Sequence, residues 1–131
     1  MADKSARPLS PHLSVWRWGP AMTVSILHRI TGGAITLAGL GVLTWWLLAI
    51  AGGSASYGSF TDLASQWFGL AVLAGLTWAF FQHALSGIRH LVTDSGENFE
   101  IRANKTSAIV TVAASLFLTA VFWYFVLGVA K

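Results

Sequence analysis

Side chains able to do chemistry stand in two groups of this 131-residue sequence, each inside or beside a long apolar stretch. The first group is Ser25, His28 and Arg29, and the second is His83, Arg89, His90 and Asp94. A charged side chain at the centre of a bilayer costs roughly 2.5 to 3.5 kcal/mol on insertion scales, so such residues normally have a partner or a function. The two groups therefore predict a polar site within a membrane protein.

His83 is the candidate metal ligand of this site. A neutral imidazole can bind haem iron axially, and Gly87 would let a flat porphyrin approach the helix backbone. His90 lies about 10 Å further along a helix axis, so His83 and His90 cannot bind one iron from opposite sides. A second axial ligand would come from His28 or from a partner subunit, and three helices enclose a porphyrin poorly, which favours the partner. The alternative is that His83 is a hydrogen-bonded structural residue.

The same histidine lies in a stripe of small residues that repeats every fourth position. The stripe is Ala71, Gly75, Ala79, His83 and Gly87. Small residues at this spacing are typical of close packing between membrane helices. The stripe therefore predicts either a packed helix face or a face left open for a flat ligand.

Ser25 and Arg29 form a second candidate site. They are four residues apart and so share one helix face, with Gly33 one turn deeper. A quinone needs hydrogen-bond donors for its carbonyl oxygens and an apolar path for its isoprenoid tail, and this face offers both. Arg29, Arg89 and His28 could also donate charge-assisted hydrogen bonds to haem propionates. The alternative is that Ser25 bonds its own helix backbone and Arg29 reaches lipid phosphate.

The composition predicts that membrane helices position these groups. The chain is 55% hydrophobic and 10% charged, whereas soluble domains are nearer a quarter charged. Each of the three long uncharged stretches exceeds the ~20 residues that span hydrocarbon. We predict an all-α integral membrane protein with spans at about 21–50, 63–92 and 105–130, and a loop of small residues at 51–59. Residues 21–131 would form the membrane domain and residues 1–20 an N-terminal strap.

Charge gives the predicted orientation. Every Lys and Arg except Lys131 lies before or near the start of the first span, or from the last turn of the second span to the start of the third. The positive-inside rule then places the N-terminus in the cytoplasm and the C-terminus outside. The net charge is +3, but the eight Lys and Arg residues form no stripe that could follow a phosphate backbone, so we expect no nucleic-acid partner. Without cysteine the chain holds no disulfide and no thiolate-bound metal or iron–sulfur cluster.

The strap at residues 1–20 contains Pro8 and Pro11, which disfavour a helix. We expect an extended segment at the inner membrane surface that docks a peripheral subunit. A mobile tail is the alternative. The segment has no apolar core followed by a cleavage site, so it does not read as a signal peptide.

Three strings in order resemble the cytochrome b membrane-anchor subunit of succinate dehydrogenase, complex II. They are RPLSPHL at 7–13, SILHRITG at 25–32, and HALSGIRHL at 83–91 with Asp94 following. The resemblance covers residues 7 to 94, and the third apolar stretch matches only in being apolar. Gln82 departs from the family, in which a tyrosine often precedes the histidine.

The resemblance implies a haem b held between this chain and a second membrane-anchor subunit. His83 would be the axial ligand from this chain, with the second histidine supplied by that partner. His28 and Arg29 would contact the haem propionates, and Ser25 and Arg29 would line the ubiquinone site. Arg89, His90 and Asp94 would lie around the haem and quinone sites. Asp94 would pair with Arg29 or Arg89, or alternatively cap its own helix.

By the same resemblance, the chain alone does not oxidise succinate. A flavoprotein subunit with FAD and an iron–sulfur subunit would pass electrons from succinate to ubiquinone, linking the tricarboxylic acid cycle to the respiratory chain. A fumarate reductase anchor and a haem-free structural anchor are the alternatives. The expected location is the bacterial inner (plasma) membrane in contact with membrane lipid; the alternative is the mitochondrial inner membrane.

Overall fold

The structure is a computed structural model that describes residues 17–129. Most of the strap predicted at residues 1–20 therefore lies outside the described residues. The elements in order are α1 (Pro20–Ala34), the π-helix η2 (Ile35–Gly39), α2 (Leu40–Ala51), α3 (Ser54–Ser65), α4 (Trp67–Asp94) and α5 (Ile101–Val129). All the regular structure between residues 17 and 129 is helical.

Three helices are long and apolar enough to cross a membrane, which confirms the predicted all-α membrane architecture. They are Pro20–Ala51 with 32 residues, Trp67–Asp94 with 28, and Ile101–Gly128 with 28. The first combines α1, η2 and α2 without a break. It begins at Pro20, next to the predicted start at about residue 21, because a first-turn proline lacks only an N–H that has no partner within the helix.

The predicted loop at 51–59 is wrong, because most of it belongs to helix α3. Gly53 has φ +84°, which ends the first membrane helix and turns the chain. The small residues after it are typical of turns, yet α3 packs against both α2 and α4. Phe60 of α3 meets Trp45 of α2 edge to face at 4.6 Å between ring centroids. Tertiary apolar contacts thus stabilise a helix that local composition does not predict.

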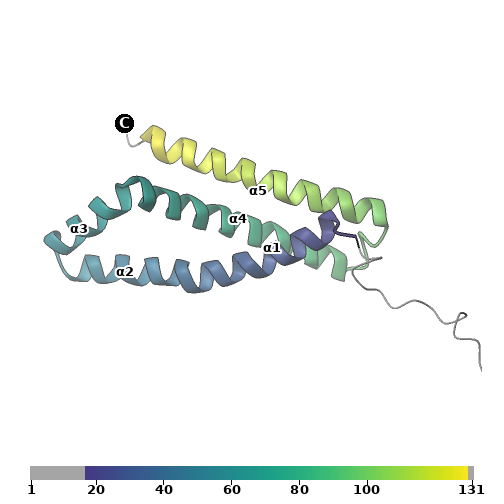
Figure 1. Cartoon of the computed structure of the whole chain (residues 1–131), viewed down its shortest axis with the longest axis horizontal. Coiled ribbons are helices and arrows are strands. Elements are labelled where there is room, and N and C mark those ends of the chain that lie inside the picture. The colour runs from purple at the N-terminus through teal and green to yellow at the C-terminus, as the bar shows by residue number, and fades with distance from the viewer. Residues whose placement is uncertain (1–16, 130–131) are drawn as a thin grey trace, which may run out of the picture.

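Helix α4 runs between α1 and α5 and packs against both (Figure 1). The buried residues of the described chain are small or polar rather than large and apolar. They are Val24, Ala49, Ala79 and Ala108 together with Thr31, Gln82, Ser86, Arg89, Thr111 and Ser115. Lipid is as apolar as a leucine side chain, so burying large apolar groups between membrane helices gives no hydrophobic stabilisation. Small side chains at these contacts instead let the helix backbones approach closely.

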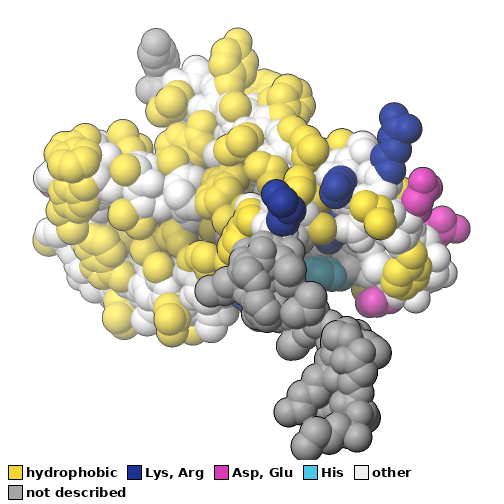
Figure 2. Space-filling view, turned by 45° about the vertical axis from the view of Figure 1, so that its right-hand side comes forward, with side chains coloured by type: hydrophobic (Ala, Val, Ile, Leu, Met, Phe, Trp, Pro, Cys, Tyr) yellow, Lys and Arg dark blue, Asp and Glu magenta, His cyan; other side chains and the backbone are white. Residues whose placement is uncertain are grey.

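The outer surface has the opposite character. Most of the face in Figure 2 is covered by hydrophobic side chains, and the charged side chains of that face gather toward one end. Exposed leucine, phenylalanine and tryptophan residues of all three membrane helices contribute to this surface. The charged end contains the connection between α4 and α5 and the start of α1, so the polar groups predicted from the sequence share one end of the bundle.

Candidate functional site

Three histidines from two helices meet where α1 packs against α4. The rings of His28 and His83 stack with centroids 4.0 Å apart and planes 6° apart. His90 approaches His28 edge to face, with centroids 5.1 Å apart. The tertiary structure thus brings His28 of the first polar group together with His83 and His90 of the second, although more than fifty residues separate the two groups in the sequence.

The ring of His83 is held through one nitrogen. Its Nδ1 lies 3.0 Å from the backbone oxygen of His28 and 3.4 Å from the hydroxyl of Thr31. Since a carbonyl oxygen only accepts, Nδ1 carries the proton and Nε2 has the lone pair. Nε2 makes no hydrogen bond within residues 17–129. Histidines that bind metals characteristically donate their other N–H to a carbonyl or carboxylate in this manner.

Thr31 and Gly32 also shape the surroundings of His83, although the sequence alone assigned them no role. Thr31 is buried and donates to the carbonyl of Leu27 on its own helix. A Cβ at Gly32 would lie only 2.9 Å from Cε1 of His83. Gly32 follows His28 by four residues and so lies on the same helix face. This spacing was the sequence signal that could have placed Gly32 beside the histidines. The ring of His83 needs the space left by this glycine.

Ser25 and Arg29 keep their polar groups free of the described chain. Ser25 is half-buried and Arg29 is exposed. Neither makes a hydrogen bond or ion pair within residues 17–129, so the backbone bond considered for Ser25 does not form. Both residues lie on α1 at the same end of the bundle as the histidines. Their donors are therefore available to a group from outside the described residues.

The Arg89 side chain is directed to α5, whereas Asp94 lies one helical turn beyond His90 on the same face of α4. The Arg89 side chain is buried against α5, where its Nε donates to Ser107 at 3.1 Å and its Nη2 donates to Asn104 at 2.8 Å. Asp94 is exposed at the end of α4 and forms no ion pair with Arg29, Arg89 or other described residues.

Gln82 precedes His83 but points to the other side of α4. It is fully buried, and its Oε1 accepts from the Ser115 hydroxyl at 2.7 Å. Trp78 Nε1 donates to the same hydroxyl at 3.2 Å. We call these three residues the α4–α5 clamp. Hydrogen bonds between membrane helices average about 0.6 kcal/mol, so the clamp helps to fix how α4 is rotated and which way His83 faces.

The small-residue stripe does not cover one contact face. Ala79 is buried, whereas Ala71 and Gly75 are exposed and a Cβ at Gly75 would meet nothing within 4 Å. Four residues rotate a helix by about 400°, so each step of the stripe drifts by about 40° around the axis. Part of the stripe is therefore open to lipid or to another protein.

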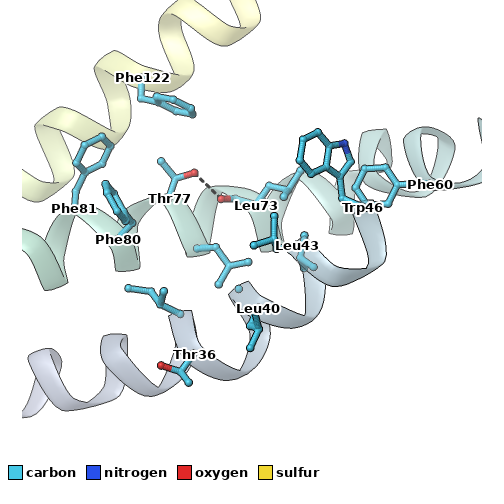
Figure 3. Close-up of a pocket in the computed structure, with 14 residues that line it drawn as sticks. Thr36, Leu40, Leu43, Trp46, Phe60, Leu73, Thr77, Phe80, Phe81 and Phe122 are labelled. Carbon is cyan, nitrogen blue, oxygen red and sulfur yellow. Dashed lines mark hydrogen bonds between the residues drawn. The ribbon is translucent and has the colours of Figure 1, made fainter. Parts of the chain in front are cut away.

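An apolar groove of about 850 Å³ begins at Phe80, one helical turn from His83. Figure 3 shows aromatic and aliphatic side chains around it, among them Leu40 and Trp46 of α2, Phe80 and Phe81 of α4, and Phe122 of α5. The groove exists because α2 does not pack on α4 between residues 17 and 129; α3 bridges them instead. The π-helix η2, which the sequence did not predict, lies at the point where the two helices separate.

In residues 17–129, no group of three histidine, aspartate or glutamate side chains could hold a metal ion by itself. The site thus offers single nitrogen ligands, free hydrogen-bond donors and an adjoining apolar space. That combination suits an amphipathic ring with a polar edge better than a bare cation.

Comparison with known proteins identifies the family. Residues 3–122 match the family model described as succinate dehydrogenase/fumarate reductase transmembrane subunit. The chain belongs to this family. The match covers most of the chain, including the larger part of the third membrane helix, and confirms the resemblance drawn from the three sequence strings.

Relatives within the succinate dehydrogenase/fumarate reductase transmembrane subunit family come from bacteria and from mitochondria. The succinate dehydrogenase cytochrome b556 subunit of Paracoccus denitrificans is 39% identical over 120 residues, covering 90% of this chain and 92% of the relative. That of Rickettsia felis is 36% identical over 117 residues, covering 89% and 90%. The mitochondrial cytochrome b560 subunit of Sus scrofa is 34% identical over 122 residues, covering 88% and 72%.

Proposed function

We propose that this chain is the cytochrome b membrane anchor of a succinate:ubiquinone oxidoreductase. In this function it binds haem b together with a second anchor subunit and forms part of the ubiquinone-reduction site. The relatives named cytochrome b subunits support the haem. The observation that carries the proposal is the His83 ring, whose Nδ1 is held by a backbone carbonyl while Nε2 is free.

The residues around His83 fit a haem. The groove that begins at Phe80, one helical turn from His83, would accommodate the apolar part of the haem. The polar propionates would meet His28 and Arg29; His28 Nδ1 is buried and has no hydrogen-bond partner within the described chain. Such an atom normally has a partner, because leaving it unpaired costs about 1–3 kcal/mol. When bound, haem supplies a one-electron redox centre. A histidine of the second anchor would supply the other axial ligand.

Ser25 and Arg29 would bind ubiquinone. The Ser25 hydroxyl would donate to one carbonyl oxygen, and the Arg29 guanidinium would stabilise the negative charge that develops there as electrons arrive. Ubiquinone takes two electrons and two protons to become ubiquinol. The free state of both side chains in the described part of this chain supports this role.

The other subunits would carry the chemistry that this chain lacks. Succinate would lose two electrons to FAD in the flavoprotein subunit, and the clusters of the iron–sulfur subunit would relay them to ubiquinone. His90 would complete the surroundings of His28 and the propionates. The Arg89 side chain is directed to α5. Asp94, one helical turn beyond His90, would face the peripheral subunits at the inner surface.

Replacing His83 by alanine in the assembled complex tests the proposal. We expect the low-spin haem spectrum to be lost or altered, because the axial nitrogen is removed. A pyridine haemochrome assay on the same preparation measures haem content. An unchanged spectrum would identify another ligand, and a wild-type complex without haem would favour a purely structural anchor.

A further inference from the structure

A second amphipathic groove lies between α4 and α5, lined by α4 residues on both sides of Arg89 and by α5. It has a volume of about 570 Å³. Its apolar wall includes Leu85 and Ile88 of α4 and Val110 and Ala114 of α5, and its polar wall includes Arg89, Glu97, Asn98 and Ser107. We call it the Arg89 groove. A long apolar channel with charge at only one end has the shape of a lipid site.

Arg89 at the polar end is a cation in need of an anion. The residue is 9% exposed, and no carboxylate among residues 17–129 forms an ion pair with it. Its Nε and Nη2 already donate to Ser107 and Asn104, while Nη1 makes no hydrogen bond within the described chain. Because a buried charge without a counter-ion is costly, the free side of this guanidinium favours a negatively charged ligand.

The depth of Arg89 suits a lipid headgroup. Helix α4 has 28 residues and so is about 42 Å long, against a hydrocarbon thickness of about 30 Å. If the excess is shared by both ends, the hydrocarbon boundary falls about 6 Å from Asp94, close to Arg89. A phosphate belongs at this level, and the apolar wall of the groove runs from it toward the membrane centre.

The charge of the groove selects the type of headgroup. Arg89 and Glu97 line the same groove without pairing with each other. Arg102 and Lys105 line a separate cavity with Glu100, so the charged side chains that line this groove are Arg89 and Glu97. One cation and one anion match a headgroup that carries both signs.

We propose that the Arg89 groove binds a phospholipid with a primary ammonium headgroup, such as phosphatidylethanolamine. The phosphodiester accepts from Arg89, the ammonium group donates to Glu97, and one acyl chain lies along Ile88, Val110 and Ala114. The site faces away from the histidines, because Arg89 points to α5. This assignment does not depend on the haem or quinone roles.

The test measures lipid retained by the assembled complex after reconstitution in phosphatidylethanolamine, phosphatidylglycerol and cardiolipin of defined ratio. Extracted lipid is counted per complex. We expect phosphatidylethanolamine to be enriched over the bulk ratio in the wild type. Arg89→Gln should reduce its retention by about tenfold, as loss of a hydrogen bond to a charged group implies. Glu97→Gln should remove the preference over phosphatidylglycerol while some lipid remains.

Two neighbouring alanines give a matched pair that leaves the Arg89 hydrogen bonds intact. Ala114 lines the Arg89 groove, whereas Ala113 lines a different cavity between α1 and α5. Ala114→Leu should fill the channel and expel the lipid, and Ala113→Leu should not. Equal lipid content in all variants, or enrichment of anionic lipid that Glu97→Gln leaves unchanged, would overturn the proposal.

A photo-crosslinking residue at position 88 distinguishes lipid from protein. Ile88 lines the groove and is exposed. Crosslinks to phosphatidylethanolamine are expected. Crosslinks to the second anchor subunit in place of lipid would overturn the assignment, because a protein side chain would then cover the groove.

Discussion

At the scale of single residues, His83 shows how a backbone carbonyl can prepare a ligand. The carbonyl of His28 fixes the tautomer of His83, so the position of one histidine on α1 determines which nitrogen the other presents. The resemblance suggested that both histidines contact one haem, His83 as an iron ligand and His28 at the propionates. It did not predict that His28 also orients His83 through its main chain.

Gly32 is the residue that gives this ring its space. Gly32→Ala should shift the low-spin haem spectrum, because a Cβ there would lie 2.9 Å from Cε1 of His83 and the ring must move. Gly33→Ala is the matched control, since its Cβ would meet nothing within 4 Å. Alanine is about 1 kcal/mol better than glycine within a helix, so the control should keep both fold and spectrum. Identical spectra for the two variants would remove this role of Gly32.

Ser25 and Arg29 should separate quinone reduction from succinate oxidation. We expect Ser25→Ala to lower succinate–ubiquinone activity several-fold and Arg29→Leu to lower it roughly 10- to 100-fold, because hydrogen bonds to charged groups are the stronger ones. Succinate oxidation with an artificial dye as acceptor should survive in the same membranes. Equal loss of both activities would point instead to failed assembly.

At the scale of elements, the α4–α5 clamp sets the rotation of the helix that carries His83. Ser115→Ala should destabilise the assembled complex by about 1 kcal/mol, because Gln82 and Trp78 lose their shared partner in a buried place. The measurement is the SDS concentration that dissociates the purified complex. Combining Ser115→Ala with Gln82→Leu should restore part of the loss, since no buried amide is then left unpaired.

Thr119→Val is the control for the clamp. Its hydroxyl donates only to the Ser115 carbonyl within its own helix, so we expect a change within about 0.5 kcal/mol. A Ser115→Ala variant as stable as this control would show that the clamp contributes little.

At the scale of the whole molecule, most charged side chains of the face in Figure 2 gather toward one end, and Figure 1 shows that α4 joins α5 at this end. The positive-inside rule predicts that this end faces the cytoplasm in a bacterium. A fluorescent reporter at the N-terminus should therefore be active inside the cell, and a phosphatase fused after Lys131 should be active outside. The reverse pattern would invert the proposed orientation and move the quinone site to the other membrane face.

The sequence by itself determined the membrane character, the three spanning helices and the family. These follow from long apolar stretches and from local strings such as those around His28 and His83, which need no knowledge of packing. It also identified Ser25 and Arg29 as a pair, because residues four apart share a helix face.

Only the tertiary structure decided which neighbouring helix each polar side chain of α4 faces. Helix periodicity gives positions around one axis, but the rotation of α4 depends on its contacts with α1 and α5. Those contacts turn Arg89 toward Asn104 and Gln82 toward Ser115 while His83 meets His28. The helix α3 arose for the same reason: Phe60 packs on Trp45, a contact between segments that local composition cannot reveal.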